Sequence, residues 1–201
     1  MVSVGPALIR RFPGAAASAP AIIETDRLVL RRPLAGDAAT VFGRYSSDPA
    51  VTRFLGWPTH QSLADARKFL AFCRAEWAQR GVGPYLIHKR GDGALLGSAS
   101  LGMESSRQAT VGYLLARDAW GHGYATEAVG AMCDLAVRLD VRWLYALCHF
   151  DNRPSWRVME KCGFRREGIL RNRAHFPNLQ PGLAADVLCY AKFFDAQPEA
   201  W

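Results

Sequence analysis

Apolar residues follow two different periods along this chain, and each change of period marks a change between strand and helix. Residues 27–32 alternate as the two faces of a strand do, and Pro33 ends the alternation. Residues 37–45 and 62–80 instead repeat their apolar positions at the spacing of a helix. The first part of the chain therefore predicts one strand followed by two helices.

From residue 85 the strand period returns, interrupted by two further helical segments. A strand, a helix and another strand in succession predict a right-handed crossover between parallel neighbours. The whole pattern predicts an α+β fold, a mixed sheet with helices packed on it. The expected elements are strands at 85–90, 95–103 and 109–115, a helix from residue 124, a strand at 142–150, a helix at 155–161, and a hairpin of 165–176 and 186–194.

The composition is that of an ordinary folded protein. With 201 residues, half of them apolar and 21% charged, the chain can bury one full core but not two. It has no apolar run of roughly 18 residues, the length of a membrane span, and residues 1–22 lack the regions of a secretory signal. We expect a cytoplasmic protein without a membrane partner, with a loose extension at 1–22, one domain at 23–195 and a tail at 196–201.

The charge and the cysteines narrow the classes of function. The formal net charge of +7 favours acidic partners, but the arginines are scattered without a basic and aromatic run, so nucleic-acid binding is not expected. The five cysteines have no CxxC pair and no histidine at ligand spacing. We expect reduced, buried thiols and no metal site for Cys73, Cys133, Cys148, Cys162 and Cys189.

The segment most informative about function is VGYLLARDAWGHGYATEAV at 111–129, where a strand, a Gly-His-Gly turn and a helix follow one another. Glycines let the backbone bend sharply, and the first N–H groups of the helix can then point at an anion. The pattern predicts a diphosphate held by amides from Gly121 to Thr126. A tight turn without a ligand is the plain alternative. A dinucleotide site fits less well, because GHGYAT has no third glycine.

Four segments, TDRLVLR, DPAVTRFLGWP, WGHGYATEA and NRPSWRVMEKCGF, occur in this order, and together they resemble the GNAT acetyltransferases, RimJ/RimL-like group, over residues 24–194. The resemblance implies a twisted, mostly antiparallel sheet of about seven strands, splayed between the fourth and the fifth, with about four helices. It implies an N-acetyltransferase that uses acetyl-CoA and no metal. The acceptor would be a protein N-terminus or a small amine, and a homodimer is common among such proteins.

The resemblance also implies roles for single residues. Main-chain groups of the fourth strand would hold the pantetheine arm, and the glycine turn would hold the phosphates. Asn152 would contact the coenzyme arm, or it would only cap the short helix. Ser155 would protonate the departing thiolate, or it would only begin that helix. The implied coenzyme-binding residues are Tyr113, Leu114, Leu115, Gly121, His122, Gly123, Tyr124, Ala125, Thr126, Asn152 and Ser155.

Several positions depart from the family pattern. Trp120 stands where the general motif opens with Arg or Gln, and Thr110 where an acidic residue often precedes the strand core. Met159 replaces the tyrosine that many members use as an acid, and Ala174 beside His175 replaces the glutamate base of RimL-like enzymes. Because of these losses, a coenzyme-binding module without turnover stays an alternative to an enzyme.

The attacking amine must lose a proton, because an alkyl ammonium with a pKa of roughly 10 is mostly charged at neutral pH. Candidate bases are Glu104, His175 and Asp186, although the pattern favours a solvated or hairpin-pairing side chain for each of them. Trp57 and His60 fall where the family builds its acceptor site, although Trp57 can equally anchor its loop in the core. No cysteine has histidine and acid partners at triad-like spacing, so we expect direct attack in a ternary complex.

Overall fold

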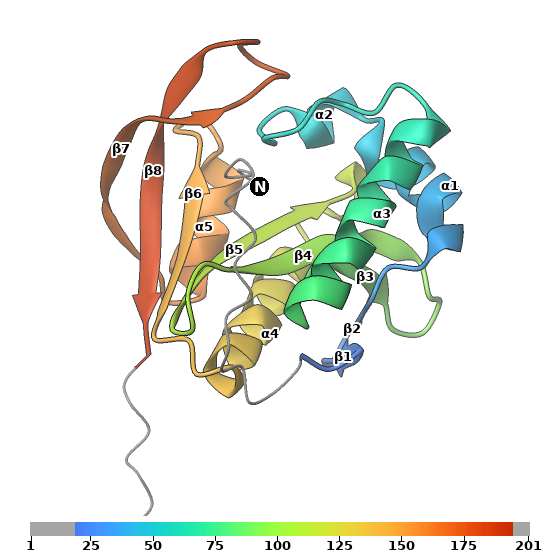
Figure 1. Cartoon of the computed structure of the whole chain (residues 1–201), viewed down its shortest axis with the longest axis horizontal. Coiled ribbons are helices and arrows are strands. Elements are labelled where there is room, and N and C mark those ends of the chain that lie inside the picture. Colours follow the sequence, from blue (N-terminus) through green and yellow to red (C-terminus); the bar gives the residue numbers. More distant parts are fainter. Residues whose placement is uncertain (1–18, 195–201) are drawn as a thin grey trace, which may run out of the picture.

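The alternating segments form strands that join into one sheet (Figure 1). The computed structural model describes residues 19–194, in which eight strands have the spatial order β1-β2-β3-β4-β5-β6-β8-β7. All neighbours are antiparallel except β5 and β6, which are parallel and joined through a helix. The predicted fold class is confirmed. The strands are β1 (Ile22–Glu24), β2 (Leu28–Arg31), β3 (Tyr85–Lys89), β4 (Leu95–Met103), β5 (Gln108–Leu115), β6 (Trp143–Cys148), β7 (Arg165–His175) and β8 (Ala184–Phe193).

The sheet starts one strand earlier than the sequence predicts. β1 pairs with β2, and ahead of it Ala19 is buried and donates its N–H to the Gly81 carbonyl at 3.0 Å. Residues 19–22 therefore belong to the packed fold and not to a loose extension. The prediction failed there because a strand of three residues is too short to show a period. The remaining residues 1–18 of the expected extension, and the expected tail at 196–201, lie outside the described residues.

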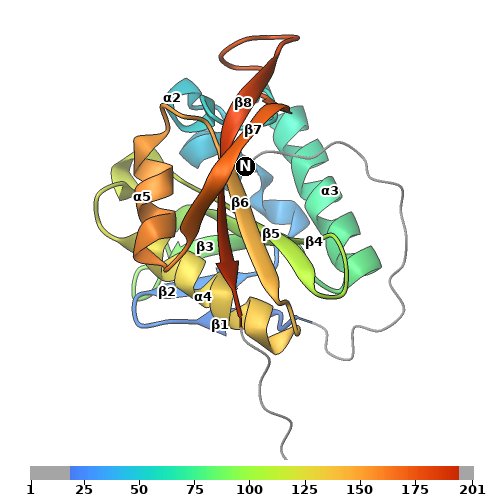
Figure 2. The ribbon, with the colours of Figure 1, turned by 90° about the vertical axis from the view of Figure 1, so that its left-hand side faces the viewer.

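Helices cover both faces of the sheet, and Figure 2 shows α3 on one side with α4 and α5 on the other. One buried cluster, which includes Leu70 and Leu114, joins the first three helices to the sheet. The other, which includes Met132 and Leu144, joins α4 and α5 to it. Among residues 19–194, no helix is long and apolar enough to cross a bilayer. The described helices are α1 (Ala38–Val41), α2 (Pro49–Thr52), α3 (Leu63–Arg80), α4 (Tyr124–Arg138) and α5 (Arg153–Lys161), where about four were expected.

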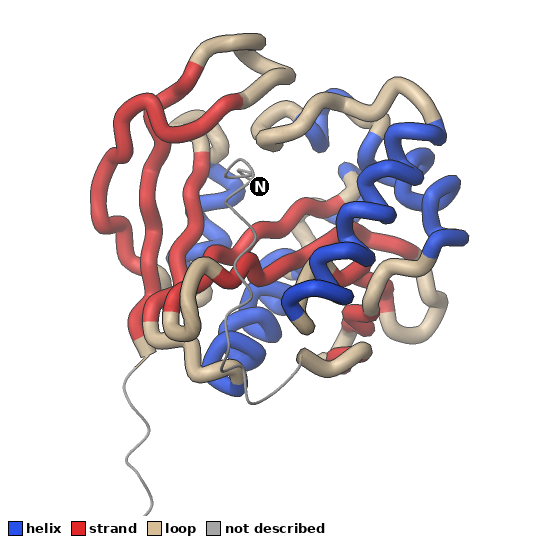
Figure 3. The backbone as a smooth tube through the Cα atoms, viewed as in Figure 1, coloured by secondary structure: helices blue, strands red, loops and turns tan. Residues whose placement is uncertain are grey.

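β5 and β6 separate soon after they meet, as the tube in Figure 3 shows. They share three ladder pairs, the last of which joins Thr110 to Tyr145. Beyond that point β5 stays on β4 and β6 stays on β8. Gly97 permits the close approach of β4, because a Cβ there would lie 2.1 Å from the Leu114 carbonyl oxygen. The splay predicted between the fourth and fifth expected strands is confirmed.

Glu127, in the first turn of α4, ties that helix to the turn between β1 and β2. Its carboxylate accepts hydrogen bonds from the Thr25 hydroxyl at 2.6 Å, the Arg27 N–H at 2.8 Å and the Arg27 Nε at 2.7 Å. Burial raises the pKa of Glu127, but these three hydrogen bonds outweigh it and hold the pKa below its ordinary value. The contact therefore fixes the position of the start of α4 relative to the edge of the sheet.

We predict that Glu127→Gln lowers the free energy of unfolding at pH 7 by about 1–2 kcal/mol. A carboxyl group whose pKa is lowered by folding contributes stability above its unfolded pKa of about 4.3, and loses it as the pH falls through the folded pKa. The difference from the wild type should shrink between pH 5 and pH 3 in urea unfolding. Glu24→Gln, at the exposed ion pair with Arg90, is the control and should cost under about 0.5 kcal/mol. A pH-independent loss for Glu127→Gln would contradict the account.

Candidate active site

The inner edge of β5 is open beyond its three pairs with β6. The Trp143 N–H donates to the Arg107 carbonyl, and the Ala116 N–H donates to the Leu96 carbonyl of β4. Because main-chain groups alternate sides along a strand, odd-numbered residues of β5 face β6 and even-numbered residues face β4. Tyr113 follows the last ladder pair and is odd-numbered, so its N–H and C=O point into the splay.

The same alternation revises the interpretation of the next two residues. Leu114 is even-numbered, so its main chain faces β4, where it is paired with Ser98. The predicted pairing of Leu114 with a coenzyme arm therefore does not fit this geometry. Leu115 faces the splay, but its carbonyl accepts a hydrogen bond from the Trp120 indole at 2.8 Å. Trp120, which replaces the usual Arg or Gln, thus holds the end of β5.

The glycine turn places several N–H groups at the start of α4 without helical partners. Gly121 and Gly123 both have φ near +80°, which favours glycine. The Glu127 N–H donates to the Gly123 carbonyl as the first helical bond, and the N-cap residue Gly123 has no side chain that could cap the helix. The amides of residues 124–126 therefore lack an intrahelical acceptor and lie at the positive end of the dipole. This geometry fits the predicted phosphate cradle.

Arg27 sets the orientation of this turn from outside it. Its Nη1 donates to the His122 carbonyl at 3.0 Å, and its guanidinium lies 4.8 Å from the centre of the Tyr124 ring. In a planar trans peptide the carbonyl and the next N–H point in opposite directions. Because the His122 carbonyl points to Arg27, the Gly123 N–H points away from that positive charge. Arg27 thus holds the turn in an orientation in which the Gly123 N–H faces away from the guanidinium.

The start of α5 contributes the predicted Asn152 and Ser155. Asn152 precedes the helix, but its side chain makes no capping hydrogen bond, so the plain capping alternative is not what the structure has. The Tyr113 hydroxyl donates to the Ser155 carbonyl at 2.6 Å and lies 3.0 Å from the Ser155 hydroxyl. Burial raises the pKa of Tyr113, which keeps this hydroxyl protonated. The sequence pattern predicted Tyr113 as a strand residue, but it did not indicate that the Tyr113 side chain contacts Ser155.

Glu104, one of the three candidate bases, contacts a residue at the point where β5 and β6 part. Its carboxylate accepts hydrogen bonds from the Tyr145 hydroxyl at 2.5 Å and from the Gln108 amide at 3.0 Å. Tyr145 belongs to the last pair between β5 and β6. Burial first, and then the Glu104 hydrogen bond, raise the pKa of Tyr145, which therefore stays a donor to that carboxylate.

The other two candidates lie on the terminal hairpin. The Asp186 carboxylate accepts hydrogen bonds from Arg171 Nη1 at 3.1 Å and from the Asn172 N–H at 2.8 Å. It therefore joins β8 to the part of β7 where the register of the ladder shifts. His175 ends β7 opposite Ala184 and is exposed. Asp186 is therefore a hairpin-pairing side chain, and its hydrogen bonds do not join it to Ser155 or Tyr113.

The predicted acceptor residues Trp57 and His60 contact each other in the loop between α2 and α3. Their rings are 4.9 Å apart, and both also lie within 6 Å of the Phe69 ring of α3, at 5.6 and 5.9 Å. Within the described residues, the Trp57 Nε1 and the His60 Nδ1 are buried without a hydrogen-bond partner. Burial lowers the pKa of His60, so the imidazole is neutral at pH 7. Trp57 therefore anchors the loop against α3, and its indole N–H is a donor without a partner among the described residues.

His149 is a residue that sequence reasoning missed. It follows β6, and its ring lies between the Phe54 ring at 5.2 Å and the Phe176 ring at 5.1 Å. Its Nδ1 accepts from the Asp151 N–H at 3.2 Å. The imidazole thus contacts Phe54 of the loop between α2 and α3, and the Asn152 N–H donates to the His149 carbonyl at 3.0 Å. Its contacts join three segments that are far apart in sequence, so no local pattern indicated it.

The five cysteines are all unpaired thiols, as predicted. Burial raises the pKa of Cys73, Cys133 and Cys148 to about 12, and it also raises the pKa of Cys162 and Cys189. At neutral pH these thiols are protonated and therefore poor nucleophiles. Among residues 19–194, no group of three or more His, Cys, Asp or Glu side chains is placed to hold a metal ion.

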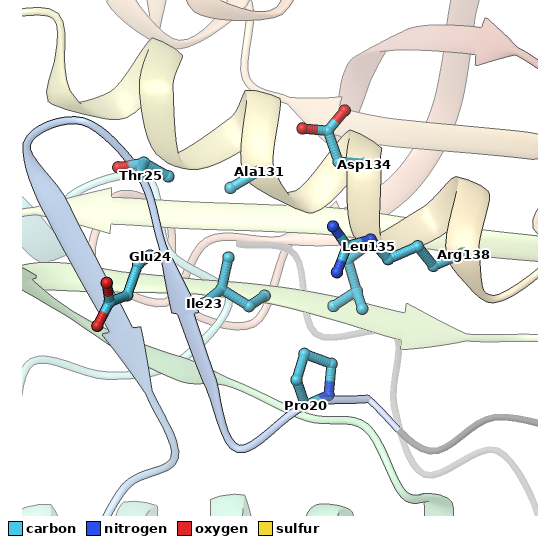
Figure 4. A pocket seen from close by; sticks show the side chains of 8 residues that line it. All are labelled: Pro20, Ile23, Glu24, Thr25, Ala131, Asp134, Leu135 and Arg138. Atoms are coloured by element: carbon cyan, nitrogen blue, oxygen red, sulfur yellow. The ribbon is translucent and has the colours of Figure 1, made fainter.

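A separate hollow lies between the first strand and α4 (Figure 4). On α4 its lining begins at Ala131, in the second half of the helix, so it includes neither the glycine turn nor the splay. It is therefore not the site that the sequence predicts. The lining residues are Pro20, Ile23, Glu24, Thr25, Ala131, Asp134, Leu135 and Arg138.

Known proteins share both the sequence pattern and the fold. Residues 27–165 match the family model described as acetyltransferase (GNAT) domain. The uncharacterized N-acetyltransferase YoaA of Bacillus subtilis is 30% identical over 154 residues, which are 75% of this chain and 86% of that protein. The uncharacterized N-acetyltransferase p20 of Bacillus licheniformis is 28% identical over 151 residues, 74% of this chain and 84% of that protein.

Two solved structures extend the comparison to three dimensions. A GNAT-family acetyltransferase from Bacillus anthracis is 25% identical with a TM-score of 0.74, covering 86% of this chain and 98% of that one. RimL, described as a ribosomal L7/L12 alpha-N-protein acetyltransferase in complex with coenzyme A, is 26% identical with a TM-score of 0.75, covering 88% of this chain and 99% of that one. Since the family model spans the splayed strands and the glycine turn, this chain belongs to the GNAT acetyltransferase family, RimJ/RimL-like group, and is an N-acetyltransferase.

Proposed function

We propose that this N-acetyltransferase takes its acetyl group from acetyl-CoA and passes it directly to a primary amine. The observation that carries the proposal is the uncapped glycine turn at the start of α4, which follows the open edge of β5 along the chain. A cradle for a diphosphate and an open strand edge for an amide-containing arm together suit coenzyme A. The solved complex of RimL with coenzyme A supports the same choice.

The main chain would do most of the binding. Amides from Gly121 to Thr126 would hold the diphosphate through charge-assisted hydrogen bonds, which are stronger than neutral ones. Main-chain groups of Tyr113 would pair with the amides of the pantetheine arm, as an added strand pairs with a sheet edge. This pairing would put the thioester close to the point where β5 leaves β6. A main-chain N–H aimed at the carbonyl there would stabilise the oxyanion, the largest electrostatic contribution in acyl transfer.

Side chains at the start of α5 would orient the coenzyme arm and protonate the departing thiolate. The side-chain amide of Asn152, which makes no capping hydrogen bond to α5, would contact the coenzyme arm. The Ser155 hydroxyl, held near Tyr113, would give its proton to the departing thiolate. A thiolate is already a good leaving group, so the loss of this proton donor should cost less than the loss of the cradle. The protonated thiols inside the fold favour direct attack over an acyl-cysteine intermediate.

The acceptor is an amine on a peptide N-terminus or a small molecule. His60, in its neutral form, and Trp57 are both partly exposed and would line the site beside the amine of that acceptor. For the amine proton we favour Glu104 over Asp186, because Glu104 contacts Tyr145 of the last pair between β5 and β6, whereas Asp186 pairs with Arg171 and Asn172 inside the terminal hairpin. His175 is kept as the alternative base. The RimL structure, an alpha-N-protein acetyltransferase, makes a free peptide N-terminus the first acceptor to test.

We predict acceptor-dependent release of free thiol from acetyl-CoA in a screen of peptides with free alpha-amino groups, amino acids and polyamines. The rate is read with a thiol reagent and corrected for hydrolysis without an amine. An N-terminally blocked copy of each active peptide is the matched control and should give only the background rate. Saturable acetyl-CoA binding without thiol release from any amine would instead make this chain a coenzyme-binding module.

We predict that Gly123→Asp weakens acetyl-CoA binding at least about tenfold relative to Gly123→Asn, measured by calorimetry. Both side chains tolerate positive φ and both cap helices well, so the fold survives in each. The two variants have nearly the same shape, and only the aspartate puts a negative charge beside the diphosphate. Equal affinities for the two variants would show that the phosphates bind elsewhere.

We predict that Glu104→Gln lowers kcat/KM at least about tenfold, while the Kd for acetyl-CoA stays within about twofold. The amide keeps the contact with Tyr145 but cannot accept the proton of the amine. Raising the pH should recover part of the rate, because more of the acceptor is then neutral. His175→Gln is the matched control on the terminal hairpin. If His175→Gln shows the larger loss, the base is His175.

A further inference from the structure

The amide of Asn178 has all of its hydrogen-bonding capacity engaged by one distant loop, residues 52–60. Asn178 lies in the connection between β7 and β8. Its Nδ2 donates to the carbonyls of Thr52 at 2.7 Å and Trp57 at 2.9 Å. Its Oδ1 accepts from the Thr59 N–H at 2.9 Å and from the Thr59 hydroxyl at 3.1 Å. Two donors and two acceptor positions are all that a carboxamide has.

The same two segments meet at a second point. Phe54 belongs to the loop and Phe176 to the β7–β8 connection, and the His149 ring packs between them. In Figure 1 the loop after α2 and the β7–β8 connection both lie above the diverging strands β5 and β6. Hydrogen bonds at Asn178 and ring contacts at His149 therefore join the loop to the β7–β8 connection at two points.

We propose that Asn178 is a positioning residue for the amine acceptor. It holds residues 52–60, with Trp57 and His60, against the β7–β8 connection, so that the wall of the acceptor site is assembled before the amine arrives. The inference rests on the proposed function, since it assumes that this loop meets the acceptor. Preorganisation lowers the ordering cost of binding, so it favours acceptor affinity.

The contact is specific to asparagine. Aspartate has nearly the same shape but no N–H group, and its charge would face the Thr52 and Trp57 carbonyls at the distances where Nδ2 now donates. Alanine would leave both carbonyls and the Thr59 N–H without this partner. Neither change touches the glycine turn or β5. The consequence should therefore fall on residues 52–60 and on the acceptor, and not on acetyl-CoA.

Hydrogen exchange on the full chain tests the link without a known acceptor. In Asn178→Asp and Asn178→Ala, peptides covering 52–60 should exchange at least about tenfold faster, while peptides covering 111–129 keep the wild-type rate. Gln180→Glu is the matched control, an amide-to-acid change at an exposed position two residues further along the same connection. In the wild type, peptides covering 52–60 and 176–180 should share one opening rate. Because it uses only the wild type, this comparison of opening rates tests the link even if a variant does not fold.

Steady-state kinetics with the best amine of the screen gives the functional measurement. Asn178→Asp should raise KM for that amine about tenfold, with Kd for acetyl-CoA within about twofold of the wild type. Unchanged exchange at 52–60, or an equal loss of affinity for amine and acetyl-CoA, would overturn the proposal. Failure of the wild type to bind acetyl-CoA would instead overturn the proposed function, and the exchange result would still report on the link.

Discussion

The early separation of β5 from β6 is the constraint on which the rest of the structure depends. β5 keeps seven ladder pairs with β4, and β6 keeps six with β8, so each strand stays in the sheet through its outer edge. Between the two inner edges only three pairs form. A buried N–H or C=O without a partner costs about 1–3 kcal/mol. The open edge therefore needs water or a ligand with main-chain-like amides.

The glycine turn is the second half of this arrangement, and its position depends on residues from elsewhere. Glu127 fixes the start of α4 through Thr25 and Arg27, and Arg27 also orients the His122 carbonyl. One short turn between β1 and β2 thus sets both where the helix begins and which way the Gly123 N–H points. The proposed phosphate cradle is local in sequence, but the direction of its N–H groups is set by tertiary contacts.

The sequence predicted those parts of the fold whose signal is local. The strand expected at 95–103 has those bounds in the structure, and the helix expected at 62–80 begins one residue later. β1 and α2, with three and four residues, are shorter than the periods that would reveal them. The alternation of main-chain groups along β5 could have excluded Leu114, since residues of opposite parity cannot face the same neighbour.

The site divides in the same way. The coenzyme side that we propose comes from one continuous stretch and from the start of α5, so a sequence pattern can indicate it. The proposed acceptor side depends on Asn178, which lies 119 to 126 residues from its partners, and on three rings from three segments. Such contacts leave no period and no motif. Because the two proposed sides share few residues, a change in the proposed acceptor wall need not move the proposed phosphate cradle, and a family pattern carried by the glycine turn does not identify the amine.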